Sequence, residues 1–194
     1  MPLKRGIDQD LLTAHATEFE PQALKEALSF HTRSTRYINV VATGLARHDL
    51  QGNSAEPMAP EHIHHALMES YRRRLNRNPA SKDTGTGRNM TRQDTPVQQR
   101  AKLIGRLANA IDASGMPRSE YAEKMRGKDE TANTILNEAV AQSAERAAKD
   151  VALANAFNAS GQSLEAFAQM YGMDARVVSA SMERVARSAA PVTP

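Results

Sequence analysis

Residues 24–53, LKEALSFHTRSTRYINVVATGLARHDLQGN, decide the fold of the first part of this chain. Leu24, Leu28 and His31 recur at helical spacing, which predicts a helix over 21–32 with these residues on one apolar stripe. Basic, hydroxyl and aromatic side chains are concentrated in the same thirty residues. That combination suits contact with a phosphate backbone.

The residues around this helix predict a small mixed domain. Helices are predicted over 7–17 and from Pro60 onward. Two extended segments, 37–41 and 46–50, are predicted on either side of the turn at Gly44. Together they indicate a compact arrangement of helices with a short β-hairpin.

Composition limits the classes of function. The chain has 194 residues and no cysteine, so disulfides, thiolate metal sites and cysteine nucleophiles are excluded. Aromatic residues make up 4%, which favours small helical units over a β-sandwich. The sequence has no apolar run long enough to span a bilayer and no signal peptide, so we expect a cytoplasmic protein that is not bound to a membrane.

The charge is distributed unevenly. The net charge of +3 alone is weak evidence for a nucleic-acid partner. Between Arg72 and Arg106, however, ten Lys or Arg residues face only two Asp. Polar residues and glycine dominate 81–95, so a flexible basic linker is predicted over 79–95. The basic stretch from Arg72 to Arg106 is either a solvated spacer or an arm that follows phosphates.

Residues 96–194 are predicted to be all helical and to contain an internal repeat. LANAIDASG at 107–115 recurs as LANAFNASG at 153–161, and the two copies extend over about 107–140 and 153–185. Only two copies are visible, so a duplicated helical unit is predicted rather than a solenoid.

Part of the second copy is similar to a DNA-reading helix-turn-helix, over residues 163–178. Ser181 stands where that motif needs an apolar residue, and the would-be recognition helix offers only Arg176 and Arg184 as basic contacts. Packing within a helical bundle is therefore favoured over DNA recognition.

The order of motifs in the N-terminal part resembles the FinO/ProQ family of bacterial RNA chaperones, over about residues 2–75. The resemblance rests on these elements: PLKRGI at 2–7, Asp10-Leu11, Ala27-Leu28, Thr32, Ser34, Arg36-Tyr37, RHDLQGN at 47–53, Glu61-His62-Ile63 and Ala66. It implies a FinO/ProQ-like RNA-binding domain over 1–78, followed by the linker and the helical region.

The resemblance, together with the chemistry of the side chains, gives a set of RNA-binding candidates. Arginine can bind phosphate bidentately, and tyrosine can stack on a base or bond to a ribose hydroxyl. The candidates are Lys4, Arg5, His31, Thr32, Arg33, Ser34, Arg36, Tyr37, Arg47, Arg72, Arg73 and Arg74.

Structural alternatives remain open for several candidates. Lys4 and Arg5 could be a solvated pair at the start of the first helix. Tyr37 and His31 could belong to the core. Arg47 could pair with Asp49, while Thr32, Ser34 and Arg36 could satisfy helix ends. His62 and His65 share a helical face, but no third ligand is in reach by sequence, so no metal site is predicted.

The leading hypothesis is an RNA-binding protein or RNA chaperone that acts in post-transcriptional regulation by small or antisense RNA. The resemblance implies recognition of a stem-loop with a 3′ single-stranded tail, and small or antisense RNAs and their mRNA targets as partners. The alternative is a DNA-binding regulator that uses the C-terminal repeat. An enzyme is not expected, since no nucleophile–base set or phosphate-cradling loop is visible, and no cofactor is implied. The sequence leaves the oligomeric state open.

Overall fold

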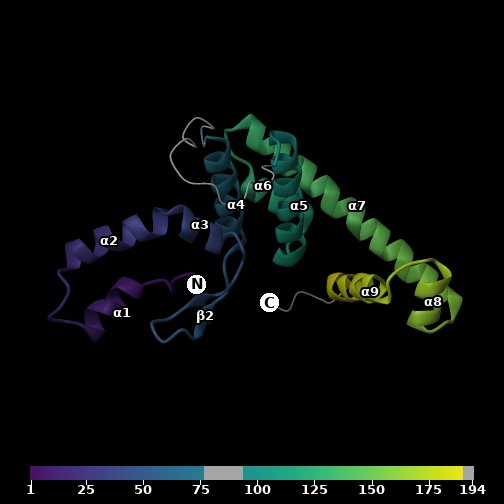
Figure 1. The fold of residues 1–194 in the computed structure, drawn as a ribbon, viewed down its shortest axis with the longest axis horizontal. Coiled ribbons are helices and arrows are strands. Elements are labelled where there is room, and N and C mark those ends of the chain that lie inside the picture. Colours follow the sequence, from purple (N-terminus) through teal and green to yellow (C-terminus); the bar gives the residue numbers. More distant parts are fainter. Residues whose placement is uncertain (77–93, 190–194) are drawn as a thin grey trace, which may run out of the picture. The chain divides into compact units, whose positions relative to one another are not determined.

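The computed structural model describes residues 1–76 and 94–189 (Figure 1). It contains two compact units, Met1–Ala110 and Ile111–Pro194. The described residues are mainly helical, with one two-stranded sheet, which confirms the predicted fold class. Nearly all of the predicted 79–95 linker lies outside the described residues, and the division into two domains and a linker stays a prediction. None of the described helices combines the length and apolar character needed to cross a membrane.

Most elements are short helices, and the sheet lies in the first unit. The first unit contains α1 (Ile7–Ala14), α2 (Pro21–Arg33), α3 (Thr35–Val41), β1 (Arg47–His48), β2 (Ser54–Glu56), α4 (Pro60–Leu75) and most of α5 (Pro96–Ser114). The second unit contains the end of α5, α6 (Arg118–Met125), α7 (Glu130–Ser160), α8 (Leu164–Met170) and α9 (Ala175–Ala189).

The predicted extended segment at 37–41 is wrong, because these residues form α3. Ser34 ends α2 with an extended backbone, and its hydroxyl accepts a hydrogen bond from the Tyr37 amide, so it caps the new helix. The β-branched residues of the segment favoured a strand by propensity. The cap and the packing of α3 on α4 override that preference.

The contact between α3 and α4 forms much of the core of the first unit. Leu67 on α4 and Ala42 at the end of α3 are buried, and Asn39 accepts a hydrogen bond from the buried Ser70 hydroxyl at 2.6 Å. The turn at Gly44 has φ +75°, and a Cβ there would lie 3.3 Å from Ile63 Cδ1. The predicted turn therefore needs glycine both for its backbone conformation and for close packing on α4.

The hairpin predicted around Gly44 is wrong, because 37–41 is helical and the observed hairpin follows that turn. Only Arg47 and His48 of the 46–50 segment form a strand, which pairs with β2 in antiparallel fashion. Asp49 turns the chain by accepting bonds from the amides of Gln51 and Asn53, and the Asn53 amide also lowers the pKa of the Asp49 carboxyl. The acceptor side chain of Asp49 thus closes the turn directly after β1.

In the second unit, the two SG sequences end their helices in the same way. Gly115 and Gly161 adopt left-handed backbones directly after α5 and α7. The Ser114 hydroxyl donates to the Ile111 carbonyl at 2.7 Å, and Ser160 donates to the Phe157 carbonyl at the same distance. The repeated sequence therefore specifies a repeated helix end.

Two aspartates clamp the helices of the second unit. Asp112 accepts from the Ser143 hydroxyl and from Arg146 at 3.1 Å. Asp150 accepts from the buried Ser181 and, at 2.6 Å, from Nε of Arg184. In both clamps the serine lies 31 residues and the arginine 34 residues after the aspartate.

The second clamp explains why Ser181 occupies a position where a helix-turn-helix needs an apolar residue. Ser181 is buried, and its hydroxyl finds an acceptor in Asp150. A buried hydroxyl with a partner is compatible with the core, whereas one without a partner would be costly. The serine thus belongs to a packing contact between α7 and α9.

Candidate nucleic-acid interface

Backbone hydrogen bonds hold the N-terminal segment against the hairpin. The Lys4 amide donates to the His48 carbonyl, and the His48 amide donates to the Pro2 carbonyl, both at 2.8 Å. Leu3 and His48 form a parallel bridge. This pairing places Lys4 beside β1, although the two are far apart in the sequence.

Leu3 connects this segment to two of the predicted site residues. Its amide donates to the Tyr37 hydroxyl at 3.1 Å, and its carbonyl accepts from Nη1 of Arg47 at 2.9 Å. Lys4, Tyr37 and Arg47 are therefore brought together around one residue. The same bonds mean that Tyr37 and Arg47 serve the fold, whatever else they contact.

Glu56 on β2 pairs with two of the predicted arginines. Its carboxylate accepts from the Arg5 amide at 3.2 Å, and it lies 3.8 Å from Nε of Arg5 and 3.5 Å from Nε of Arg47. Only 14% of the Arg47 side chain is exposed, against 64% for Arg5. The ion-pair partner of Arg47 is thus Glu56, across the hairpin, and not the nearby Asp49.

Lys4 is accessible but already paired. Its Nζ donates to Oδ2 of Asp10 at 2.8 Å, and the hydrogen bond and charge of Asp10 raise the pKa of Lys4. Asp8 and Asp10 both lie in the first turn of α1, where the helix end would otherwise favour an anion. A phosphate at Lys4 must therefore compete with Asp10.

The two hydroxyl candidates at the end of α2 differ in what they still offer. Thr32 donates its hydroxyl proton to the Leu28 carbonyl at 2.9 Å. Ser34 uses its oxygen as an acceptor for the Tyr37 amide, so its own proton is not committed in that bond. Since a phosphate oxygen needs a donor, Ser34 is the better placed of the two.

Two arginines near the α2–α3 junction are exposed. The side chains of Arg33 and Arg36 make no hydrogen bond or ion pair with any described residue. His31 is also exposed, and its ring meets that of Tyr37 edge-on with 5.3 Å between centroids. His31 is therefore not the core residue that its place on the apolar stripe suggested.

The three arginines near the end of α4 lie in different environments. Arg73 pairs with Glu69 at 2.7 Å and donates to the Arg33 carbonyl at 2.8 Å, which ties α4 to the α2–α3 junction. Arg72 also has an interaction partner. Arg74 is exposed, and its charge contributes to lowering the pKa of Arg106, for which burial is the larger cause. Of the three, Arg74 is exposed and makes no hydrogen bond or ion pair with a described residue.

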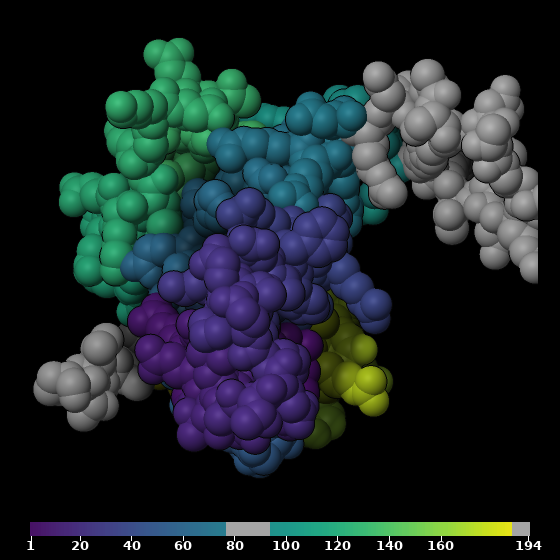
Figure 2. Space-filling view, turned by 90° about the vertical axis from the view of Figure 1, so that its left-hand side faces the viewer, coloured from purple at the N-terminus to yellow at the C-terminus, as the bar shows by residue number. Residues whose placement is uncertain are grey.

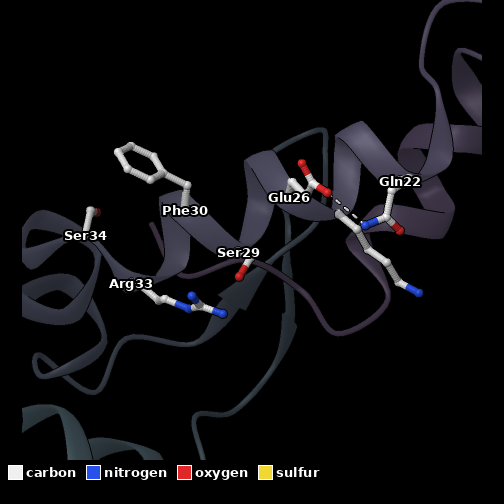
Figure 3. A pocket seen from close by; sticks show the side chains of 7 residues that line it. Gln22, Glu26, Ser29, Phe30, Arg33 and Ser34 are labelled. Atoms are coloured by element: carbon white, nitrogen blue, oxygen red, sulfur yellow. Dashed lines mark hydrogen bonds between the residues drawn. The ribbon is translucent and has the colours of Figure 1, made fainter.

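A groove along the outer face of α2 was missed by the sequence analysis. Figure 2 shows the surface of the first unit on which α1 and α2 (purple) are exposed, and Figure 3 shows the groove itself. Phe30 is 82% exposed there, on a different side of the helix from the buried Leu24. The helical position of an aromatic residue off the apolar stripe was the signal that could have revealed it. The lining residues are Gln22, Lys25, Glu26, Ser29, Phe30, Arg33 and Ser34.

His62, His64 and His65 lie on α4. Within residues 1–76 and 94–189, no three His, Asp or Glu side chains are arranged to hold a metal ion. His64 is instead a largely buried group. Burial, and to a lesser degree the charges of His65 and Arg72, lower its pKa to about 4, so this imidazole is neutral at neutral pH.

Comparison with known proteins assigns the N-terminal part of the chain to a protein family. Residues 1–83 match the ProQ/FINO family, which covers α1 to α4 and the hairpin described above. Through this domain the chain belongs to the ProQ/FinO family.

Several curated relatives are similar to this chain, and each is named RNA chaperone ProQ. The protein from Aeromonas hydrophila subsp. hydrophila is 37% identical over 61% of this chain and 53% of its own length. The Aeromonas salmonicida protein is 31% identical over 72% of this chain and 66% of its own length. A relative from Shewanella frigidimarina is 39% identical over 34% of each chain. The chain thus spans about half to two thirds of the length of the first two relatives. No solved structure matches the chain.

Proposed function

We propose that this protein is an RNA-binding protein that acts as an RNA chaperone. Its ligand would be a stem-loop with a 3′ single-stranded tail, in small or antisense RNAs and their mRNA targets. The role would be post-transcriptional regulation in the cytoplasm, without catalysis. Membership of the ProQ/FinO family and the name shared by the relatives support this proposal.

The observation that carries the proposal is the contact network around Leu3. It gathers Lys4, Tyr37 and Arg47, and Tyr37 in turn is bonded to Ser34 at the α2–α3 junction. Arg33 and Arg36 flank that junction with exposed side chains that have no partner within residues 1–76 and 94–189. The N-terminal segment, the hairpin and the junction thus bring aromatic, hydroxyl and cationic groups to one part of the first unit.

These groups suit RNA because A-form helices are recognised mainly through phosphates, ribose hydroxyls and unpaired ends. The deep major groove of RNA hides its base edges from side chains. Arginine and serine supply donors for backbone oxygens, and an exposed histidine and a tyrosine supply faces for unpaired bases. No sequence-specific helix insertion is needed for such binding.

No observation favours the DNA-binding alternative. Residues 111–194 contain nine Lys and Arg against eleven Asp and Glu, a net charge of −2. Arg184, one of the three arginines of α9, is held by Asp150 at 2.6 Å and 2.7 Å. A net acidic unit in which Arg184 is already paired with a carboxylate is poorly suited to phosphate binding.

A competition experiment tests the proposal. A labelled RNA hairpin with a 3′ tail is bound by the full chain and followed by fluorescence anisotropy. Unlabelled hairpin should displace it at far lower concentration than duplex DNA of the same length, compared at one fixed salt concentration. Equal displacement by both competitors would leave only non-specific polyanion binding, and the proposed function would be rejected.

A further inference from the structure

The groove on α2 is lined by two parallel rows of side chains. Residues four apart on a helix form a ridge, so Lys25, Ser29 and Arg33 make one row and Glu26, Phe30 and Ser34 make the other. Figure 3 shows Ser29 and Arg33 on one side of the α2 ribbon and Phe30 on the other. The groove therefore has a cationic, hydroxyl-bearing wall opposite an aromatic one.

The cations of the first row are available to a ligand. Lys25 and Arg33 are exposed, and neither side chain bonds to a described residue. Eight residues separate them, which is about 12 Å along the helix axis. The only carboxylate lining the groove, Glu26, accepts a hydrogen bond from Gln22 at 2.9 Å, away from the Arg33 end. The Phe30 end of the groove is therefore the more favourable end for an anion.

The aromatic ring of Phe30 is unusually open. It is 82% exposed, the highest value among the large apolar side chains of the described residues. A single exposed apolar residue needs no explanation by itself. Here the ring lies beside Lys25, Arg33 and the Ser29 hydroxyl. An aromatic ring next to cations and a hydroxyl can bind a nucleotide through base stacking and phosphate contact.

We propose that Phe30 is a stacking platform for an unpaired base of the bound RNA, with Lys25 and Arg33 holding the adjacent phosphates. This inference rests on the proposed function and deepens it, since it assigns the groove to a single-stranded nucleotide flanking the hairpin. The groove volume of about 670 Å³ lies within the roughly 300–1,000 Å³ typical of small-ligand sites, so one base fits. One ring gives too little apolar surface to hold an amphipathic partner helix, which needs several anchors.

The chain contains no tryptophan, which allows a direct test of stacking. The Phe30→Trp variant carries one indole in the groove, and a base stacked on it quenches its fluorescence. We expect quenching on titration with a tailed hairpin RNA and none with the same hairpin cut blunt. Abasic nucleotides in the tail should abolish the quenching while anisotropy still reports binding.

Phe19→Trp is the matched control. Phe19 is partly exposed at 40% and lies just before α2, where its ring contacts His15 and not the groove. Its indole should keep its fluorescence when RNA binds. Equal quenching of both variants would overturn the assignment to the groove, because it would report a general effect of RNA on indole emission.

Affinity gives a second measurement. Because base–aromatic stacking is sequence-tolerant, Phe30→Ala should weaken binding of the tailed RNA about tenfold for any tail sequence, and leave the blunt hairpin unchanged. Equal loss for both RNAs, or no loss for either, would overturn the stacking role.

If wild-type protein binds neither RNA, the proposed function fails as a whole. If wild type binds but Phe30→Trp is not quenched, this inference alone fails. Fluorescence that changes with protein concentration in the absence of RNA would assign the groove to a second copy instead.

Discussion

The two units of this protein use their basic residues in opposite ways. Residues 1–110 contain sixteen Lys and Arg against eleven Asp and Glu, and several of these cations, including Lys25, Arg33 and Arg36, have no partner among the described residues. Residues 111–194 are net acidic, and Arg146 and Arg184 are held by Asp112 and Asp150. Several cations of the first unit are thus exposed, whereas two arginines of the second unit are fixed by aspartates within its packing.

This contrast shows that the partner of a charge matters more than the total charge. The net charge of +3 for the whole chain is the sum of +5 for the first unit and −2 for the second. Even within the first unit, Arg47 is largely buried against Glu56 while Arg36 is exposed. A basic residue contributes to phosphate binding only to the extent that it is not already neutralised by a carboxylate.

The largest effect is expected when a clamp of the second unit is broken. Asp150→Ala leaves the buried Ser181 hydroxyl without its acceptor and Arg184 without its counter-charge. We expect a loss of about 3 kcal/mol in the free energy of unfolding, below the upper range for fully buried pairs because Arg184 is partly exposed. Urea denaturation followed by circular dichroism measures it.

The RNA affinity of the same variant tests whether the second unit contributes to binding. Under conditions where Asp150→Ala remains folded, its affinity for a tailed hairpin should match that of the wild type. Asp174→Ala is the control for stability, since Asp174 is exposed and bonds only to backbone near the start of α9. An RNA-binding defect in folded Asp150→Ala would break the contrast, because the second unit would then contribute to the ligand site.

The next effect concerns the basic residues between α4 and α5. Replacing Arg77, Lys82, Arg88 and Arg92 by Gln removes four positive charges without touching α5, where Leu103 is buried. If these residues follow phosphates, the slope of log affinity against log salt should become shallower by up to about 3. Titrations between low and moderate salt measure this slope. An unchanged slope would make the segment a spacer that only connects α4 to α5.

The sequence predicted the class of fold, but not which charged side chains are exposed and which are paired. Helical periodicity and turn residues are local signals, so the helices beginning near 7, 21 and 60 and the Gly44 turn could be predicted, whereas the hairpin was placed around Gly44 instead of between β1 and β2. Tyr37–Val41 was assigned wrongly because β-branched residues favour a strand, whereas the Ser34 cap and contact with α4 decide the structure.

The candidate site was predictable as a set of residue types and not as a set of partners. The pairing of Arg47 with Glu56 depends on strand register, and the pairing of Lys4 with Asp10 depends on where α1 begins. Phe30 was overlooked because an apolar residue in a helix is ordinarily assigned to the core. Exposure and pairing are tertiary properties, and they separate the residues that can bind from those that only hold the fold.

A smaller effect is expected from the unpaired cation at the start of α3. Arg36→Ala should weaken binding of a tailed hairpin about tenfold or more, on the order of 1–3 kcal/mol for a charge-assisted contact. Arg176→Ala removes the same charge from an exposed position in the acidic unit, so it is the matched control and should leave affinity unchanged. Anisotropy titrations compare the two. Equal losses would mean that net charge alone governs affinity, and that the first unit holds no localised site.

The smallest effect concerns Lys4 in the first unit, whose side chain is accessible but paired with Asp10. Its ion pair with Asp10 is partly exposed, and such pairs contribute at most about 1 kcal/mol to stability. Asp10→Asn should therefore stay folded, and it releases Lys4 from its competing carboxylate, so we expect RNA affinity to rise about threefold. Asp8→Asn is the control, because Asp8 lies in the same helical turn and the substitution changes the net charge equally. A gain confined to Asp10→Asn would place a phosphate at Lys4. Equal gains in both variants would reduce the effect to general electrostatics, and Lys4 would then be one more cation that serves the fold.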